Sequence, residues 1–220
     1  MKRTRQVHVA LGLALALAGT VTLAPEVLAF PHQQRIGDTI VYSDTPLPAT
    51  MPQVLAHSDG LLRHSAIYGP GYGRRIFLTD GGWRWHVLAF QTPGAFALTR
   101  PISEAIVVNR SNPALDRVDN AAAIGGTRTL SGVIAHERTH GLLRARYGIL
   151  TDLRYPAWLR EGYCDVVAGG GSLTDRAAAA LEARHVPHPA LVYYHGRKRV
   201  AERLAANGGN VDALFSPQNQ

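Results

Sequence analysis

Two histidines and a glutamate stand at a spacing that suits a metal site. The segment Val133–His140 reads VIAHERTH, so His136 and His140 are four residues apart. Residues four apart on a helix lie one turn apart on nearly the same face, and two imidazoles placed in this way can bind one zinc ion. Glu137 lies about 100° around the helix from His136. Its carboxylate therefore borders the metal and can accept a proton from a bound water.

A catalytic zinc site takes three protein ligands and keeps one position open, so a third ligand must be found. The metzincin pattern would place a glycine three residues after His140 and another histidine three residues later. Leu143 and Arg146 occupy those positions, which excludes that pattern.

The remaining option is a glutamate from a second helix. The segment Trp158–Gly162 reads WLREG and supplies Glu161. The helix that carries the histidines should end at Gly148, and the chain returns after Pro156. Two helices joined by a loop of this length can bring Glu161 back beside the histidines. The alternative interpretation is a structural helix with two unrelated histidines.

These two segments together resemble the gluzincin zinc peptidases, which include the thermolysin-like and aminopeptidase-like branches. The resemblance rests on H-E-x-x-H at 136–140 and W-L-x-E-G at 158–162, with 20 residues between His140 and Glu161. It covers roughly residues 75–215 and is strong only at 133–167. It implies one Zn²⁺ held by His136, His140 and Glu161, with Glu137 as the general base.

The resemblance also implies roles for residues around the metal. By similarity to the thermolysin-like branch, Asp165 would orient His136. A tyrosine or histidine further along would hydrogen-bond the oxyanion, and among Tyr193, Tyr194 and His195 we select Tyr194. The segment Gly94–Leu98 stands where the aminopeptidase-like branch carries an acid that binds the substrate amine. This chain has no acid there, which disfavours aminopeptidase specificity.

The order of the expected elements predicts an α+β fold, with a small, mostly antiparallel N-terminal sheet followed by a helical half that carries the zinc site. Residues 83–92 fit a strand or a short helix equally, and 111–126 are expected to form a long polar loop. Strands are expected at 39–43, 75–79, 95–99 and 105–109. Helices are expected at 51–66, from a cap at Thr129 or Ser131 to Tyr147, at 158–167, from Thr174 to about Arg184, and at 190–206.

The N-terminus has the pattern of an export signal. Basic residues at positions 2, 3 and 5 precede the apolar run 7–23, and small residues lie three and one positions before Phe30. This pattern predicts a secretory signal peptide at 1–29, followed by a single zinc-peptidase-like domain at 30–220. The alternative is membrane anchoring by residues 7–23, which are at the short limit for a span. Either way we expect the domain to be exported, and to be periplasmic, extracellular or membrane-anchored and facing outside the cytoplasm.

Composition further narrows the possible partners and the possible kinds of site. The net charge of +7 is not organised into basic runs with aromatic residues, so no nucleic-acid partner is expected. The lone cysteine, Cys164, excludes an internal disulfide and, by the same count, a cysteine-based zinc site. Two rivals to a zinc-dependent hydrolase of peptide or protein substrates stay open: an exported, non-catalytic zinc-binding module with the peptidase fold, and a helical envelope protein without metal. The sequence does not determine the oligomeric state.

Overall fold

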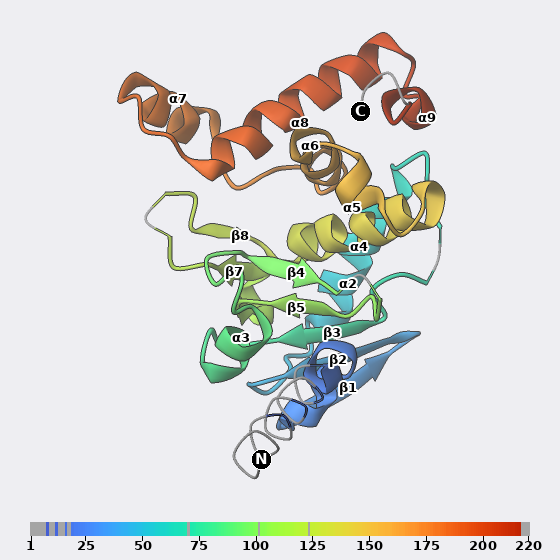
Figure 1. The fold of residues 1–220 in the computed structure, drawn as a ribbon. Coiled ribbons are helices and arrows are strands. Elements are labelled where there is room, and N and C mark those ends of the chain that lie inside the picture. Colours follow the sequence, from blue (N-terminus) through green and yellow to red (C-terminus); the bar gives the residue numbers. More distant parts are fainter. Residues whose placement is uncertain are drawn as a thin grey trace.

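The computed structural model describes residues 8, 12, 16 and 19–216, apart from residues 70, 101 and 123. Figure 1 shows the main sheet in the lower part of the domain and the C-terminal helices above it, with α4 (Leu130–Tyr147) between them. The helix α6 (Ala157–Val167) packs on α4, and α8 (Pro189–Ala206) packs on α6. The described chain is an α+β domain, which confirms the predicted class.

A five-stranded sheet forms the base of the domain, in the order β1-β2-β3-β5-β4. The central strand β3 runs parallel to both of its neighbours, while β1 and β4 pair antiparallel at the two edges. The larger sheet is therefore mixed, although four of the six strand pairings in the described chain are antiparallel. Its strands are β1 (His32–Ile36), β2 (Thr39–Ser43), β3 (Arg75–Leu78), β4 (Ala97–Thr99) and β5 (Ile106–Val108).

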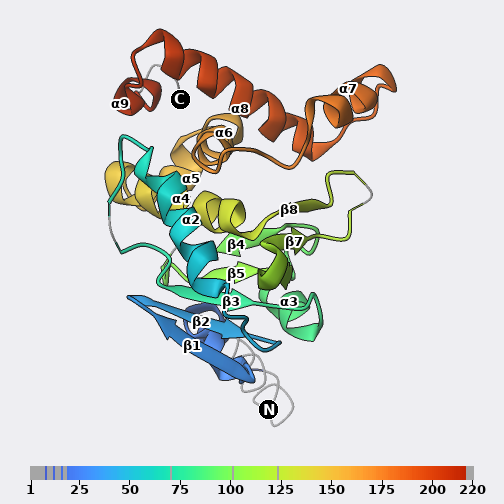
Figure 2. The same cartoon turned by 180° about the vertical axis from the view of Figure 1, so that it is seen from behind.

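Both faces of the central strands are covered, which explains their unbroken apolar sequences. Ile76 points to one face, where it packs with residues of α2 (Met51–Arg63) and α4. Seen from behind in Figure 2, α2 lies across α4 on this side. Phe77 points to the other face and packs with Trp85 of α3 (Trp83–Leu88). The ambiguous segment 83–92 is thus a short helix, whose side chains cover the lower face of the sheet.

A second, smaller sheet replaces much of the loop predicted at 111–126. It consists of β6 (Arg110–Asn112), β7 (Arg117–Asp119) and β8 (Thr127–Thr129), all antiparallel, with the 3₁₀ turn η2 (Pro113–Leu115) after β6. The loop prediction is wrong in this part and holds only between β7 and β8. The strands were missed because they are short and polar, and only Val118 in them is buried among core residues.

The helical half follows the sequence prediction closely. Thr129 is the cap of α4, since its hydroxyl accepts a hydrogen bond from the Gly132 amide, and α4 ends at Gly148 as expected. Thr174 caps the third helix in the same way. Two single-turn helices, α5 and α9, were not predicted because each is too short for a periodic pattern. The remaining helices are α5 (Thr151–Arg154), α7 (Asp175–Ala183) and α9 (Val211–Leu214).

Most of the apolar run 7–23 lies outside the described residues. The part from residue 19 onward packs on the domain: Val21 is buried beside α3, and η1 (Pro25–Leu28) follows it. Glu26 forms an ion pair with Arg75 at 2.9 Å, and the Arg84 guanidinium donates hydrogen bonds to the carbonyls of Leu28 and Ala29. Within the described part of the chain, no helix has the length and apolarity to cross a membrane.

Two glycines set the crossing of α6 and α8, and thereby the position of the helix that carries Glu161. A Cβ atom at Gly196 would lie 2.3 Å from the carbonyl oxygen of Trp158, and one at Gly162 would lie 2.5 Å from the carbonyl carbon of Gly196. Both contacts are with backbone atoms, which cannot move aside alone. Neither glycine can therefore carry a side chain unless the helices separate.

We predict that Gly196→Ala lowers the free energy of unfolding by about 2 kcal/mol, because overpacking outweighs the gain in helix propensity. Gly60→Ala in α2 is the matched control. A Cβ there would meet no atom within 4 Å, so this variant should gain about 0.5–1 kcal/mol. Urea unfolding followed by circular dichroism measures both values. Equal effects at the two positions would contradict the close crossing.

Candidate metal site and cleft

The helix α4 places the two histidines of the motif side by side. The rings of His136 and His140 lie 5.2 Å apart between centroids, with an angle of 70° between their planes. Both side chains are largely buried, because β4, α2 and α6 pack around α4. The four-residue spacing thus produces the ring pair that the sequence predicts.

Glu161 returns on α6 to the same point. Its Oε2 atom lies 3.2 Å from Nε2 of His136 and 3.6 Å from Nε2 of His140. Burial would raise the pKa of Glu161, but His140 and His136 lower it well below its ordinary value. The carboxylate is therefore held in its charged form, beside two potential metal-binding nitrogens.

Cys164 also belongs to this site, one helical turn after Glu161. One donor atom from each of His136, His140 and Cys164 lies within 4.8 Å of the others, so this group could hold a metal ion. The prediction that excluded a cysteine ligand was too broad, because a site built on two histidines needs only one more donor. Burial raises the pKa of the Cys164 thiol well above its ordinary value, and the carboxylates of Glu161 and Glu137 raise it further.

Asp165 contacts the other nitrogen of the first histidine. Its Oδ1 atom lies 2.8 Å from Nδ1 of His136 and also accepts a hydrogen bond from Arg128 at 3.0 Å. Burial would lower the pKa of His136, but Asp165 and the hydrogen bond with Glu161 raise it to about 10. The surrounding acids thus favour a positive charge at this ring, which either a proton or a metal cation can supply.

Thr99, at the end of β4, contacts Glu137 in a way that the sequence did not reveal. Its hydroxyl lies 2.7 Å from Oε2 of Glu137 and 3.1 Å from the Glu137 carbonyl oxygen. This hydroxyl fixes the rotamer of the carboxylate at the edge of the sheet. The only signal in the sequence is the position of Thr99 at the end of a predicted strand, which does not specify its neighbour.

The two tyrosines at the start of α8 point in different directions, since successive residues on a helix are about 100° apart. The Tyr194 hydroxyl donates to Asp175 at 2.7 Å, and its ring packs with Leu173 and Leu181 away from the histidines. Tyr193 instead lines a cleft that it shares with His136, His140 and Glu161. Burial raises the pKa of Tyr193, and the charge of Glu161 raises it further. The structure therefore places Tyr193, not the selected Tyr194, at the site.

His136, His140 and Glu161 form part of the wall of a cleft of about 510 Å³, within the usual range for ligand sites. One end is bounded by the β7–β8 loop, which Figure 1 shows on the same side of the domain as α7. This loop touches the chain before α7 so closely that a Cβ on Gly125 would lie 2.0 Å from the Ser172 carbonyl oxygen. The strand β4 forms a side wall, so the cleft is open but bounded.

Charged residues form the other end of the cleft. Arg160 donates to Asp152 at 2.9 Å and lies 3.4 Å from Oε1 of Glu161, the oxygen that faces away from the histidines. Arg144 contacts Asp152 as well and forms a two-point ion pair with Glu104. A chain of ion pairs thus leads from the loop before β5 to the candidate metal ligand.

Comparisons with protein-family models, with curated proteins and with solved structures found no match for this chain.

Proposed function

We propose that this protein is an exported, zinc-dependent peptidase. One observation carries the proposal: Oε2 of Glu161 lies 3.2 Å from Nε2 of His136 and 3.6 Å from Nε2 of His140, and Glu137 lines the same open cleft. A cleft with a metal-capable group and an adjacent general base supports hydrolysis of a bound substrate. Localisation outside the cytoplasm rests on the export pattern of residues 1–29.

The donor set fits zinc. Tetrahedral zinc binds histidine nitrogens and carboxylate oxygens at about 2.0–2.1 Å, which separates two ligand atoms by about 3.3 Å. The observed 3.2 and 3.6 Å lie on either side of that value. Two imidazoles and one carboxylate leave a fourth position open, as catalytic zinc sites require. When bound, zinc would supply a Lewis acid that activates a water and polarises the scissile carbonyl.

Glu161 is a better third ligand than Cys164 on geometric grounds. Its carboxylate oxygen already lies at ligand spacing from both ring nitrogens, whereas the cysteine is only within 4.8 Å of them. Cys164 is also fully buried, so its sulfur packs within the core beside α8 residues such as Val200. Cys164 thus belongs to the core behind the site and is not among the residues that line the cleft.

The chain's own residues would then move the proton. Glu137 accepts a proton from the attacking water and later delivers it to the leaving amine. Thr99 keeps the Glu137 carboxylate turned toward the cleft by its hydrogen bond. Tyr193 and His188, which line the cleft at the start of α8, are the available donors for the oxyanion, in place of Tyr194.

The peptide backbone of a substrate would bind along β4. The strand β5 lies between β3 and β4, while β4 is the last strand of its sheet in the described chain. Residues 94–99 line the cleft next to Glu137. An extended peptide can add to such an edge by main-chain hydrogen bonds and present its carbonyl to the metal site.

The third ligand is tested by zinc titration against a competing chelator. Glu161→Gln should lower zinc affinity by about 100-fold or more, since even the outer partners of zinc ligands contribute 10–100-fold. Cys164→Ser should change affinity little, and His140→Ala provides the reference for a lost ligand. Retention of zinc in Glu161→Gln together with its loss in Cys164→Ser would reverse the assignment.

The general base is tested with Glu137→Gln, which keeps the shape of the side chain. We expect unchanged zinc content and a fall in kcat of about 10²–10⁴-fold on a broad peptide library, because proton transfer is lost. Glu202→Gln, at an exposed position of α8, is the control and should retain full activity. Normal hydrolysis by Glu137→Gln would refute the role. A wild-type chain that binds zinc but cleaves no peptide would instead support the non-catalytic zinc-binding module.

The positioning role of Thr99 predicts a selective loss of turnover. Thr99→Val removes a hydrogen bond to a charged group, worth about 1.5–3 kcal/mol, so kcat should fall about 10–100-fold while KM stays close to the wild-type value. Thr99→Ser keeps the hydroxyl and should restore most of the activity. Equal kcat in the Val and Ser variants would show that the hydroxyl does not act on Glu137.

A further inference from the structure

Large apolar side chains are exposed on four neighbouring parts of the surface, which are the N-terminal segment, α3 and the residues just after it, the loop before β5, and α5 with the residues before it. On and just after α3, Trp83 and Phe90 are 57% and 69% exposed. On the loop before β5, Ile102 is 75% exposed, and at the end of α5 Leu153 is 85% exposed. We define the apolar face as the exposed residues Leu23, Val27, Trp83, Val87, Phe90, Ile102, Ile149, Leu150 and Leu153.

Printed contacts connect these parts into one surface. Val21 packs with Trp85 and Leu88, which places residues 21–23 beside α3. Arg75 donates to the carbonyls of both Leu23 and Ser103, which places the loop with Ile102 next to the N-terminal segment.

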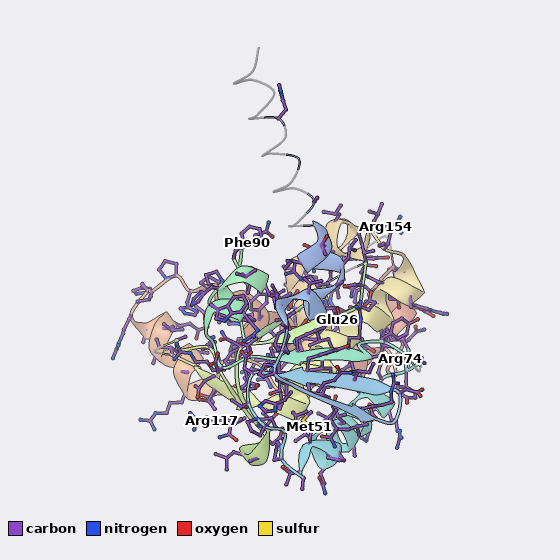
Figure 3. All side chains as sticks on the ribbon, turned by 90° about the horizontal axis from the view of Figure 1, so that it is seen from below. Glu26, Met51, Arg74, Phe90, Arg117 and Arg154 are labelled. Atoms are coloured by element: carbon purple, nitrogen blue, oxygen red, sulfur yellow. The ribbon has the colours of Figure 1, made fainter. Side chains whose placement is uncertain are left out.

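The same loop leads on to α5. Glu104 pairs with Arg144, and Arg144 contacts Asp152, the residue before Leu153. Figure 3 shows the labelled Phe90 and Arg154 along the same edge of the domain, whereas Arg117 and Met51 lie along the opposite edge. The apolar face therefore occupies one side of the molecule.

We propose that the apolar face rests on an anionic lipid bilayer. Its side chains belong to separate protruding elements, which can enter the boundary of a bilayer together but do not form a groove for a partner helix. Trp83 is of the residue type that favours membrane interfaces. Arg154 follows Leu153, is exposed, and forms no ion pair with the residues that the structure describes, so it is available to a lipid phosphate.

The course of the N-terminal segment supports a bilayer as the occupant. The apolar run 7–23 enters the domain at this face, because its last residues, 21–23, pack beside α3 and Arg75. Residues 26–29 are held there by Arg75 and Arg84. An apolar segment that reaches a membrane from this point would bring the apolar face against the lipid. This inference is independent of the proposed peptidase activity, and it takes residues 7–23 as the membrane anchor, the alternative to a signal peptide at 1–29.

The test uses the full chain with single cysteines introduced by Phe90→Cys and Leu153→Cys, each labelled with the environment-sensitive fluorophore NBD. Cys164 is fully buried and should not react. Leu115→Cys is the matched control, because Leu115 is 67% exposed and lies two residues before Arg117 on the opposite edge. The chains are reconstituted in phosphatidylcholine–phosphatidylglycerol vesicles that contain a doxyl-labelled lipid quencher.

We expect several-fold stronger quenching at positions 90 and 153 than at 115. Leu150→Ser combined with Leu153→Ser should weaken the quenching of the label at position 90, whereas Leu115→Ser should not. Equal quenching at 90, 153 and 115 would overturn the proposal. The proposal would also be overturned if positions 90 and 153 became shielded from iodide in detergent without vesicles, and more strongly so at higher protein concentration. That result would assign the apolar face to contact with a second copy of the chain.

Discussion

The rest of the structure depends on the burial of α4 on every side. Residues 130–144 of this helix are all buried, yet many of them are polar and no apolar stripe runs along it. A buried polar side chain is costly unless it is hydrogen-bonded, so every such residue needs a partner from a neighbouring element. The pairs are Ser131–Asp116, His136–Asp165, Glu137–Thr99, Arg138–Asp59 and Arg144–Glu104.

These pairs connect α4 to nearly every layer of the fold. The partners come from η2 and its following turn, β4, α2, α6 and the loop before β5. Each pair therefore positions a separate element around the helix. The candidate metal site uses the same contacts, because Asp165 and Glu161 approach α4 from α6 while Thr99 approaches it from β4. The stability of the core and the geometry of the site depend on one set of interactions.

The candidate cleft and the apolar face are neighbours through α5. Asp152 lines the cleft and contacts Arg160 beside Glu161, while Leu153, the next residue, is the most exposed large apolar side chain of the described chain. On a bilayer, the charged end of the cleft would lie close to the lipid headgroups. Substrate segments near the membrane surface would then reach β4 without passing around the domain.

Much of the site could be predicted from sequence because it depends on local helix geometry. The spacing of His136 and His140 follows from one capped helix, the return of Glu161 was inferred from a second helix after Pro156, and the role of Asp165 was implied by the resemblance. The helix boundaries were predictable for the same reason, since capping residues and glycine stops act within a few residues. Short polar strands such as β6 and β7 carry no such signal, and their pairing was not predictable.

The sequence by itself determined the imidazole pair of α4, because four-residue spacing and capping act within one element, while Glu161 was predicted from the segment WLREG and its resemblance to the gluzincins. Only the tertiary structure decided which residues from other elements meet them: Thr99 on Glu137, Cys164 beside the histidines, and Tyr193 rather than Tyr194 in the cleft. Those contacts depend on how β4, α6 and α8 pack around α4. Packing between elements distant in sequence is a property of the whole fold, and no local pattern encodes it.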